Sequence, residues 1–320
     1  MAVSADGNTL FASSGQLYAS TNWGTSWSQL TNLPNYGGVS GAQFICCSGD
    51  GSKVLVAHGS GLYEANSLSG PLYSSFDSGY TWTTNNVPLA KWQCAAMSAD
   101  GSKLFAAIAG GGLFASANFG QTWTSNATPN NSVIVAIAAS ADATKLAAAS
   151  YSGNLYTSTS FGASWLANNA PNLSWGSIAS SADGHKLAAT VGAFEGASGG
   201  IYSSTNGGST WVPNTAPVRN WTTVACSADG CRQFAAGYDG DKIYSVTLTT
   251  APPLLQLANL GNAMMLSWPV TSTKVALQQS SNLVDWAIFP SVAALNVTNL
   301  NSQAMIQASN GGAFFRLQTQ

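Results

Sequence analysis

Short runs of alternating apolar and polar residues, separated by small polar turns, cover the first 250 residues of the chain. In one stretch the alternation predicts four strands, at about 133–140, 145–149, 154–158 and 164–166. The first two are separated by Asp142, and similar runs recur on both sides. Alternation over four to eight residues between turn residues is typical of strands that bury one face. The pattern predicts an all-β protein.

One tetrapeptide marks an internal repeat. Ser-Ala-Asp-Gly, or a close variant, occurs six times, and successive copies start 44, 50, 42, 41 and 46 residues apart. The six copies begin at Ser4, Ser48, Ser98, Ser140, Ser181 and Ser227. Asp-Gly between two alternating strands signals a hairpin, because glycine reaches positive φ without a Cβ clash. A period in the forties with several short strands is typical of the blades of a β-propeller.

An eight-residue motif follows each of the first five tetrapeptides. The second copy reads Ser75-Phe76-Asp77-Ser78-Gly79-Tyr80-Thr81-Trp82, and the others occupy residues 20–27, 116–123, 158–165 and 204–211. These segments resemble the Asp box of sialidase-type (BNR) propellers, Ser-x-Asp-x-Gly-x-Thr-Trp. Only Asp77 keeps the acid, and the other copies carry Asn22, Asn118, Ser160 and Asn206. Asn and Ser side chains also bond turn backbone, so the turn is expected to survive the change.

The resemblance implies a six-bladed propeller over residues 1–250. In that family the box is the turn between the third and fourth strands of a blade, on the outer rim, with its Trp packed into the blade. The resemblance does not carry the sialidase reaction with it. That family clamps its substrate with three arginines, whereas this chain has only Arg219, Arg232 and Arg316, the last of them in the tail.

The two ends of the repeat predict an incomplete ring. The first unit lacks most of its first strand, and the sixth, at about 220–248, lacks the box and the fourth strand. A six-bladed ring closes imperfectly unless upstream residues supply a strand, and a seventh blade is an open alternative. Met1-Ala2-Val3 begins within a strand pattern and no signal peptide is visible, so we expect upstream sequence to be missing.

After Thr250-Ala251-Pro252-Pro253 the pattern changes. Residues 253–320 predict seven short strands, at about 254–260, 264–268, 274–279, 286–289, 294–297, 304–307 and 313–317. This alternation is typical of a small antiparallel β-sandwich. The tail resembles the immunoglobulin- or fibronectin-like C-terminal modules of secreted bacterial proteins, through Leu283-Val284-Asp285-Trp286 and Phe314-Phe315-Arg316-Leu317.

Composition narrows the class of partner. Only 7% of the residues are charged and the net charge is −2, so no basic stripe exists to neutralise a row of phosphates. No apolar run reaches the roughly 20 residues that cross a bilayer. A surface of Ser, Thr, Asn, Gln and Gly indicates an extracellular protein, and we expect neither a nucleic-acid partner nor a membrane span.

The face opposite the tetrapeptide turns is the predicted binding face, because loops left free by a rigid scaffold usually carry function. Trp92, Trp175 and Trp221 recur there, each eight residues before a turn aspartate. An indole suits stacking on a sugar ring. The alternative is that each Trp packs between blades. Lys91 and Arg219, next to or near these tryptophans, are further candidate ligand contacts.

Four acids are candidate catalytic groups on the same face. Glu64 and Glu195 lie in insertions of blades two and five, and Asp239 and Asp241 lie in a loop of blade six. Two carboxylates across a cleft are what glycoside hydrolysis requires. Solvated loop acids are the ordinary alternative.

No metal site or cofactor is expected. Histidines and cysteines lack ligand spacing. Asp239-Gly240-Asp241 could hold a calcium ion, but it is too short to be a specific calcium motif. Cys226 and Cys231 flank a tetrapeptide and could form a disulfide across its hairpin, while Cys46, Cys47 and Cys94 are expected to be buried thiols.

Three hypotheses for function follow. The first is a secreted binding or scaffold propeller for a glycan or cell-surface polymer. The second is a glycoside hydrolase or polysaccharide lyase that uses the acids of the same face. The third is a protein-assembly scaffold with a protein partner. It would be similar to the photosystem-assembly propellers, whose repeats resemble those of this chain.

Overall fold

The structure is a computed structural model, and every regular element but one among its described residues is a strand. It describes residues 1–14, 16–34, 44–59, 69–151, 153–192, 198–237, 243–248, 255–260, 263–270, 275–290, 293–296, 300–307 and 313–319. The exception is the 3-10 turn η1 (Pro129–Asn131). Among these residues no helix is long and apolar enough to cross a membrane.

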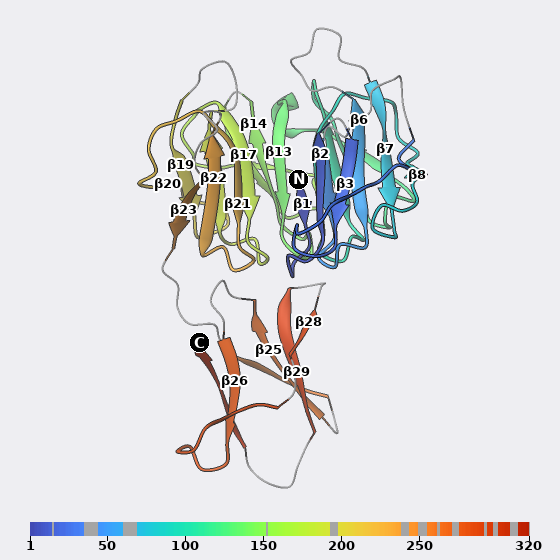
Figure 1. Ribbon diagram of the computed structural model, residues 1–320. Helices are drawn as coiled ribbons and strands as arrows, with labels where there is room; N and C mark the ends of the chain where they lie inside the picture. The colour runs from blue at the N-terminus through green and yellow to red at the C-terminus, as the bar shows by residue number, and fades with distance from the viewer. Residues whose placement is uncertain are drawn as a thin grey trace.

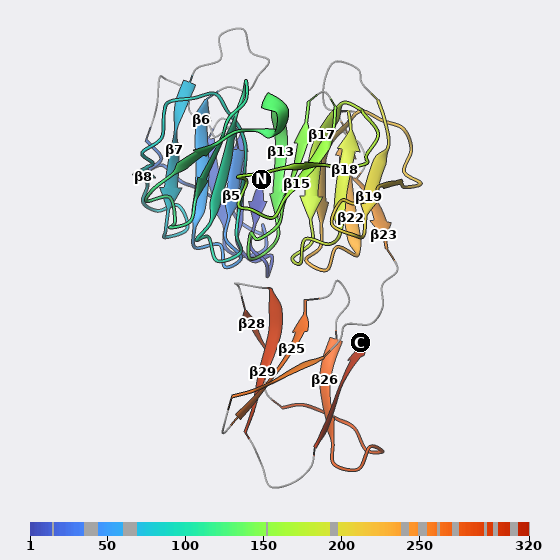
Figure 2. The same ribbon diagram turned by 180° about the vertical axis from the view of Figure 1, so that it is seen from behind.

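The described part of residues 1–248 forms six small antiparallel sheets, one for each tetrapeptide, arranged like the blades of a propeller (Figures 1 and 2). Sheet one contains β1 (Ala2–Val3), β2 (Leu10–Ser14), β3 (Gln16–Ser20) and β4 (Ser28–Gln29). Sheet two contains β5 (Phe44–Cys47), β6 (Val54–Gly59), β7 (Ser69–Ser75) and β8 (Thr83–Thr84). Sheet three contains β9 (Trp92–Met97), β10 (Leu104–Ile108), β11 (Leu113–Ser116) and β12 (Thr124–Asn126).

The remaining three sheets continue the same order. Sheet four contains β13 (Ile134–Ala139), β14 (Leu146–Ser150), β15 (Leu155–Ser158) and β16 (Leu166–Ala167), close to the predicted strands. Sheet five contains β17 (Trp175–Ser180), β18 (Leu187–Val191), β19 (Ile201–Ser204) and β20 (Val212–Pro213). Sheet six has three strands among the described residues, β21 (Trp221–Cys226), β22 (Arg232–Gly237) and β23 (Ile243–Thr247).

Each tetrapeptide closes its hairpin through a serine and an aspartate. In sheet three the Ser98 hydroxyl donates to Asp100 Oδ1 at 2.6 Å and accepts the backbone N–H of Lys103. Asp100 Oδ1 also accepts the N–H of Ser102. Gly101 has φ +73°, the left-handed conformation that the hairpin requires. The equivalent bonds recur in all six turns.

A chain of backbone hydrogen bonds links these turns from sheet to sheet. The second residue of each of the first five tetrapeptides donates its N–H to the carbonyl of the equivalent residue in the next sheet, at 2.6–2.7 Å. The five donor–acceptor pairs are Ala5–Gly49, Gly49–Ala99, Ala99–Ala141, Ala141–Ala182 and Ala182–Ala228. We call these the turn-to-turn hydrogen bonds. They place every sheet at the same height relative to its neighbour.

Lysines add a second link between turns. Lys103 Nζ donates to the carbonyl of Asp142 at 2.6 Å, and Lys145 and Lys186 make the same bond to Asp183 and Asp229. Each of these lysines stands five residues after the tetrapeptide serine. The chemistry of this position differs in sheet one, where Thr9 takes the place of lysine.

The core lies between the faces of successive sheets. In β14 every residue is buried, including Ala147, Ala148 and Ala149, because small side chains let neighbouring sheets approach on both faces. The clusters of buried residues each span two neighbouring sheets, in chain order from sheet one to sheet six. Alanine-rich strands thus occupy the crowded positions between successive sheets.

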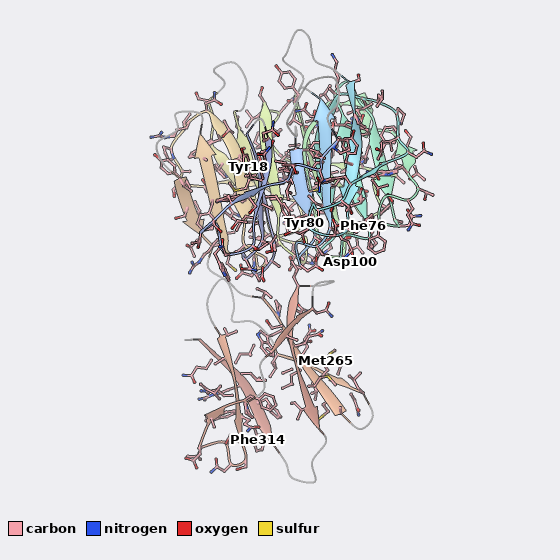
Figure 3. The ribbon with its side chains drawn as sticks, turned by 45° about the vertical axis from the view of Figure 1, so that its right-hand side comes forward. Tyr18, Phe76, Tyr80, Asp100, Met265 and Phe314 are labelled. Atoms are coloured by element: carbon pink, nitrogen blue, oxygen red, sulfur yellow. The ribbon has the colours of Figure 1, made fainter. Side chains whose placement is uncertain are left out.

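The five boxes close by one common set of bonds. Asp77 Oδ1 accepts from the Ser75 hydroxyl and the Thr81 N–H, and Asn22, Asn118, Ser160 and Asn206 accept the equivalent N–H. Boxes also bond to the tetrapeptide turn of their own sheet, as Ser78 N–H does to the Ser52 carbonyl. Figure 3 shows Phe76, Tyr80 and Asp100 at the end of the propeller that faces the C-terminal segment. These bonds bring the tetrapeptide turns and the boxes to one face of the propeller.

Residues 255–319 form two further antiparallel sheets around one hydrophobic cluster. One sheet has the order β24 (Gln256–Asn259), β25 (Ala263–Pro269), β29 (Asn301–Gln307), β28 (Ala294–Asn296); the other has the order β27 (Ala287–Ile288), β26 (Val275–Ser280), β30 (Phe314–Thr319). Leu266, Trp268, Leu277 and Ala304 are buried between them. Seven strands were predicted here, and seven are present in the described part of this segment.

The C-terminal segment lies beside the turn face of the propeller (Figure 1). A Cβ added to Gly49 would stand 3.3 Å from the Leu300 side chain, so Leu300 rests over the tetrapeptide turn of sheet two. This segment also repeats the box hairpin in shortened form. Asn282 accepts the N–H groups of Val284 and Asp285, and Trp286 Nε1 donates to the Leu283 carbonyl.

The disulfide that the sequence allowed between Cys226 and Cys231 does not form. Cys226 pairs across the hairpin with Gln233, whereas Cys231 lies within the turn, with its Sγ 3.6 Å from Lys186 Nζ. The Ser227 N–H donates to the Arg232 carbonyl across the hairpin. Cys231 therefore lies inside the turn and not opposite Cys226.

Acid should weaken the turns. Burial alone would raise the pKa of Asp50, Asp100 and Asp142, but the hydrogen bonds from serine and threonine hydroxyls and from backbone N–H groups bring each below its ordinary value. A depressed pKa contributes stability above the unfolded-state value, near 4, that is lost as the pH falls through the folded-state value. We expect urea unfolding to give a constant free energy between pH 5 and pH 7 and a falling one below about pH 4. Asp100→Asn should reduce the fall in the free energy of unfolding below pH 4. An equal fall in the variant would contradict the role given to the Asp100 carboxylate.

Candidate functional site

The four acids predicted to act in catalysis fall outside the described residues. Glu64, Glu195, Asp239 and Asp241 all lie in segments that the structure does not describe. Among the described residues no group of three His, Cys, Asp or Glu side chains could hold a metal ion.

The three tryptophans lie at the end of the sheets opposite the tetrapeptide turns, as predicted, but they are not at the surface. Trp92, Trp175 and Trp221 each begin the first strand of a sheet and are 0% exposed. Trp92 Nε1 donates to the Gly70 carbonyl and Trp175 Nε1 to the Gly153 carbonyl. A buried indole offers no face to a sugar ring. Their burial supports packing between sheets, the alternative to stacking on a ligand.

Arg219 and Lys91 are not brought together around a ligand cavity. The Arg219 guanidinium lies over the Tyr244 ring, 5.0 Å from its centroid, and Tyr244 packs edge-on against Trp221 at 5.2 Å. Arg219 therefore covers the packed layer of sheet six. Lys91 is exposed beside buried Trp92.

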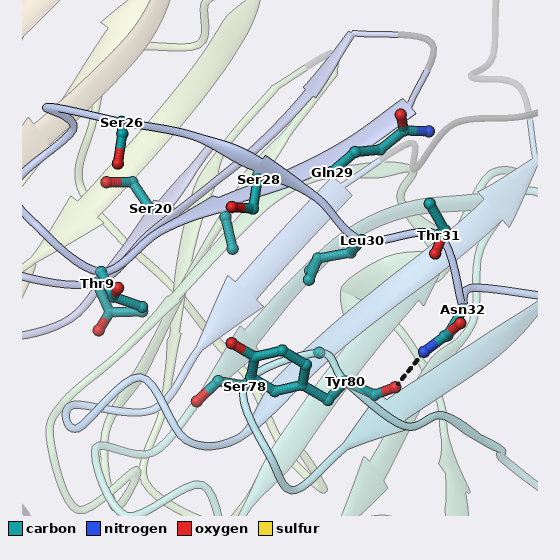
Figure 4. A pocket seen from close by; sticks show the side chains of 13 residues that line it. Thr9, Ser20, Ser26, Ser28, Gln29, Leu30, Thr31, Asn32, Ser78 and Tyr80 are labelled. Carbon is teal, nitrogen blue, oxygen red and sulfur yellow. Dashed lines mark hydrogen bonds between the residues drawn. The ribbon is translucent and has the colours of Figure 1, made fainter.

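A cavity of about 290 Å³ lies elsewhere, between sheet one and the box of sheet two (Figure 4). Hydroxyl and amide side chains provide most of its wall, and none of its lining residues is charged. They are Thr9, Ala19, Ser20, Thr21, Ser26, Ser28, Gln29, Leu30, Thr31, Asn32, Ser78, Gly79 and Tyr80. We call this cavity the hydroxyl pocket.

Two contacts hold the wall of the hydroxyl pocket. Asn32 Nδ2 donates to the Tyr80 carbonyl at 3.0 Å, which ties sheet one to the box of sheet two. The Tyr80 side chain remains 63% exposed and provides an aromatic surface at the edge of the pocket. Leu30 supplies an apolar floor and is buried.

A change at one repeat position explains why the pocket is here. The equivalent cavity between sheets four and five measures about 60 Å³ and is lined by Lys145. In sheet one the same position is Thr9, whose side chain packs against Gly51 of the next turn but carries no ammonium group to bond the next turn's carbonyl. The shorter side chain leaves room between the sheets and removes a positive charge from the wall.

Sequence reasoning did not identify this pocket, although two signals were present. Thr9 departs from the Lys or Arg that follows the other five turns, and Tyr80 is an aromatic residue where the other boxes have Thr25, Gln121, Ala163 or Ser209. These two exceptions to the repeat lie in sheets one and two. Only the folded structure shows that Thr9 and Tyr80 line the same cavity.

Comparisons with known proteins show a β-propeller. No protein-family model matches the sequence, and no curated protein matches it. Solved structures do: a GH74 xyloglucanase from Xanthomonas campestris is 16% identical with a TM-score of 0.57, over 84% of this chain and 50% of that one. A GH74 enzyme from Niastella koreensis is 14% identical with a TM-score of 0.56, over the same shares. This chain thus spans half the length of these two enzymes.

YCF48 is a second kind of similar structure. YCF48 from Cyanidioschyzon merolae is 17% identical with a TM-score of 0.54, over 73% of this chain and 76% of that chain. At such identities the similarity shows the fold alone, an all-β propeller with BNR-type neighbours.

Replacement of a buried tryptophan should destabilise the fold. Trp175→Ala leaves a large cavity between sheets four and five, and we expect a loss of about 3–5 kcal/mol in the free energy of unfolding measured in urea. The control is Trp27→Ala, because Trp27 is a box tryptophan that is 40% exposed and does not lie in the core between sheets. Equal losses for both variants would contradict the packing role of Trp175.

The cysteines should be unreactive in the native protein. Burial raises the pKa of Cys47, Cys94 and Cys226 to about 12, so each stays a thiol at neutral pH. Iodoacetamide at pH 8 should leave these three peptides unlabelled by mass spectrometry, and should label all of them after unfolding in guanidinium. Rapid native labelling of Cys226 would show that its environment is open.

Proposed function

We propose that this protein is a carbohydrate-binding propeller and that the hydroxyl pocket holds a neutral sugar. The observation that carries this proposal is a cavity of about 290 Å³ with hydroxyl and amide walls and no charged lining residue. Hydroxyls and amides both donate and accept hydrogen bonds, which matches the alternating donors and acceptors of a sugar. The absence of charge among those residues disfavours phosphate, sulfate and uronate ligands.

Tyr80 would supply the stacking surface in place of the three buried tryptophans. An exposed phenol ring combines apolar area with a polar tip. The backbone carbonyl of Tyr80, and not its ring, accepts the hydrogen bond from Asn32. The ring therefore remains available to stack on a sugar. The pocket size suits one or two sugar rings rather than a long polymer, whose remaining units would extend into solvent.

The finer description of the molecule belongs to the same proposal. We take residues 1–250 as a six-bladed sialidase-type propeller and 253–320 as an immunoglobulin- or fibronectin-like sandwich, in a secreted protein. Support comes from six tetrapeptide turns, from five boxes with equivalent hydrogen bonds, and from two C-terminal sheets around one cluster. The low charge of the chain supports an extracellular location.

The first alternative to sugar binding in the hydroxyl pocket is glycoside hydrolysis on the face opposite the tetrapeptide turns. Two GH74 enzymes have a similar fold, and Glu64, Glu195, Asp239 and Asp241 are the acids that such a reaction would use. A protein-assembly scaffold is a second alternative. It is favoured by the burial of the three tryptophans and by the similarity to YCF48, for which a structure bound to D1 peptide exists.

Tyr80→Ala should weaken sugar binding without unfolding the protein. Loss of one aromatic surface corresponds to about a fivefold increase in Kd, measured by titration calorimetry with the neutral oligosaccharide that scores highest on a glycan array. Gln121→Ala is the matched control, because Gln121 holds the same box position in sheet three.

Thr9→Lys provides an independent test at the opposite wall. It restores the residue type that the other turns carry, so it should be tolerated by the fold while its side chain fills the pocket. We expect binding to fall below detection with an unchanged melting temperature. Undiminished binding in both Tyr80→Ala and Thr9→Lys would place the ligand elsewhere, and release of reducing sugar by the wild-type protein would favour the hydrolase.

A further inference from the structure

One position of the repeat shows which face of each sheet meets the next sheet. The residue seven places after the tetrapeptide serine is 0–2% exposed in sheets one to five, where it packs toward the following sheet. These residues are Phe11, Leu55, Phe105, Ala147 and Ala188. In sheet six the same position is Phe234, which is 41% exposed. Among the described residues, no following sheet therefore covers the second face of sheet six.

The neighbours of Phe234 on that face are open as well. Ala225 and Ser245 pair with Phe234 across the sheet, and both are exposed. Ile243, on the same face, is exposed too. The opposite face of sheet six is closed, because Val224 and Ala235 pack on sheet five.

In the described part of the chain, sheet one likewise has no preceding sheet against the corresponding face. The residues six and eight places after the serine face the previous sheet and are buried in sheets two to six, for example Leu146 and Ala148. In sheet one these residues are Leu10 and Ala12, which are only partly buried. Among the described residues no packing like that between successive sheets joins sheet six to sheet one.

The turn-to-turn hydrogen bonds end at the same place. Ala228 accepts from Ala182, but within the described part of the chain its own N–H meets no acceptor. At the other end Ala5 donates to Gly49, and its carbonyl receives no N–H from the described residues. One donor and one acceptor of a bond repeated five times are thus left over, on the two sheets whose faces are open. Figure 1 shows β21 and β1 on either side of this opening, with β13 behind them.

We propose that the opening between sheets six and one is a docking site for one more antiparallel sheet of this same repeat. Its tetrapeptide would accept the Ala228 N–H and donate to the Ala5 carbonyl, and its two faces would cover Phe234 on one side and Leu10 on the other. Continuity with five existing interfaces identifies this occupant. If sheets six and one packed directly on each other, Phe234 and Leu10 would be buried between them. A sheet from a second copy of the chain is a poorer fit, because the other five sheets of that copy would have to be accommodated as well.

The experiment adds the missing sheet in register. A copy of residues 92–136, placed directly before Met1, continues into sheet one without a shift, because Met1 stands three residues before Ser4 as Ile137 stands three before Ser140. Hydrogen exchange by NMR should then show the Ala228 amide at least tenfold slower than in the original chain. The Ala182 amide, which is already bonded, is the internal reference and should change little.

A pair of substitutions tests the open face in the chain as it exists. Phe234→Gln should leave the melting temperature unchanged in the original chain, whereas Ala188→Gln, at the same repeat position in sheet five, should lower it by at least 5 °C. In the extended chain Phe234→Gln should become destabilising as well. A large loss for Phe234→Gln in the original chain would show that the face is already covered, and dimers in light scattering that Phe234→Gln dissolves would assign it to a second copy. Either result, or fast Ala228 exchange in a folded extended chain, overturns the proposal.

Discussion

The arrangement of the sheets depends on one short backbone contact, the hydrogen bond from the second residue of each tetrapeptide to its counterpart in the next sheet. It forms only if every turn has the same shape, and the Ser-x-Asp side-chain bonds impose that shape. This explains why serine and aspartate recur at six turns while the glycine can become Ala143, whose φ is still +50°. A common turn height then brings alanine-rich strand centres into contact, and the packing of the core follows.

Much of this could be predicted from sequence because it is local. The hairpin, the box and the strand alternation are each encoded within about ten residues, and the strands of sheet four were placed within two residues. The conformation within a box was harder. Trp23 and Phe119 adopt positive φ, which side chains other than glycine rarely do. The bonds of the box enforce that backbone, so a preference read residue by residue would not find it.

Sequence spacing alone could not decide between ligand stacking and packing for the three tryptophans. Spacing placed Trp92 and Trp175 at the correct end of their strands, but spacing cannot tell whether the neighbouring sheet covers an indole. Repetition was itself informative, since a residue that recurs in register across several sheets is more often part of the interface between them. The hydroxyl pocket arises from the opposite circumstance, an exception to the repeat at Thr9 that meets a second exception at Tyr80.

The hydroxyl pocket and the opening of the ring both involve sheet one, and this connects them physically. Sheet one is held on a single face, by the Ala5–Gly49 bond and by the cluster around Phe11 and Ile45. A sheet packed against its other face would restrict how far sheet one can move relative to the box of sheet two, and Tyr80 and Asn32 would keep one separation. A ligand and a packing partner that favour the same arrangement stabilise each other's binding reciprocally. We therefore expect a sheet bound in the opening to raise the affinity of the hydroxyl pocket for its ligand.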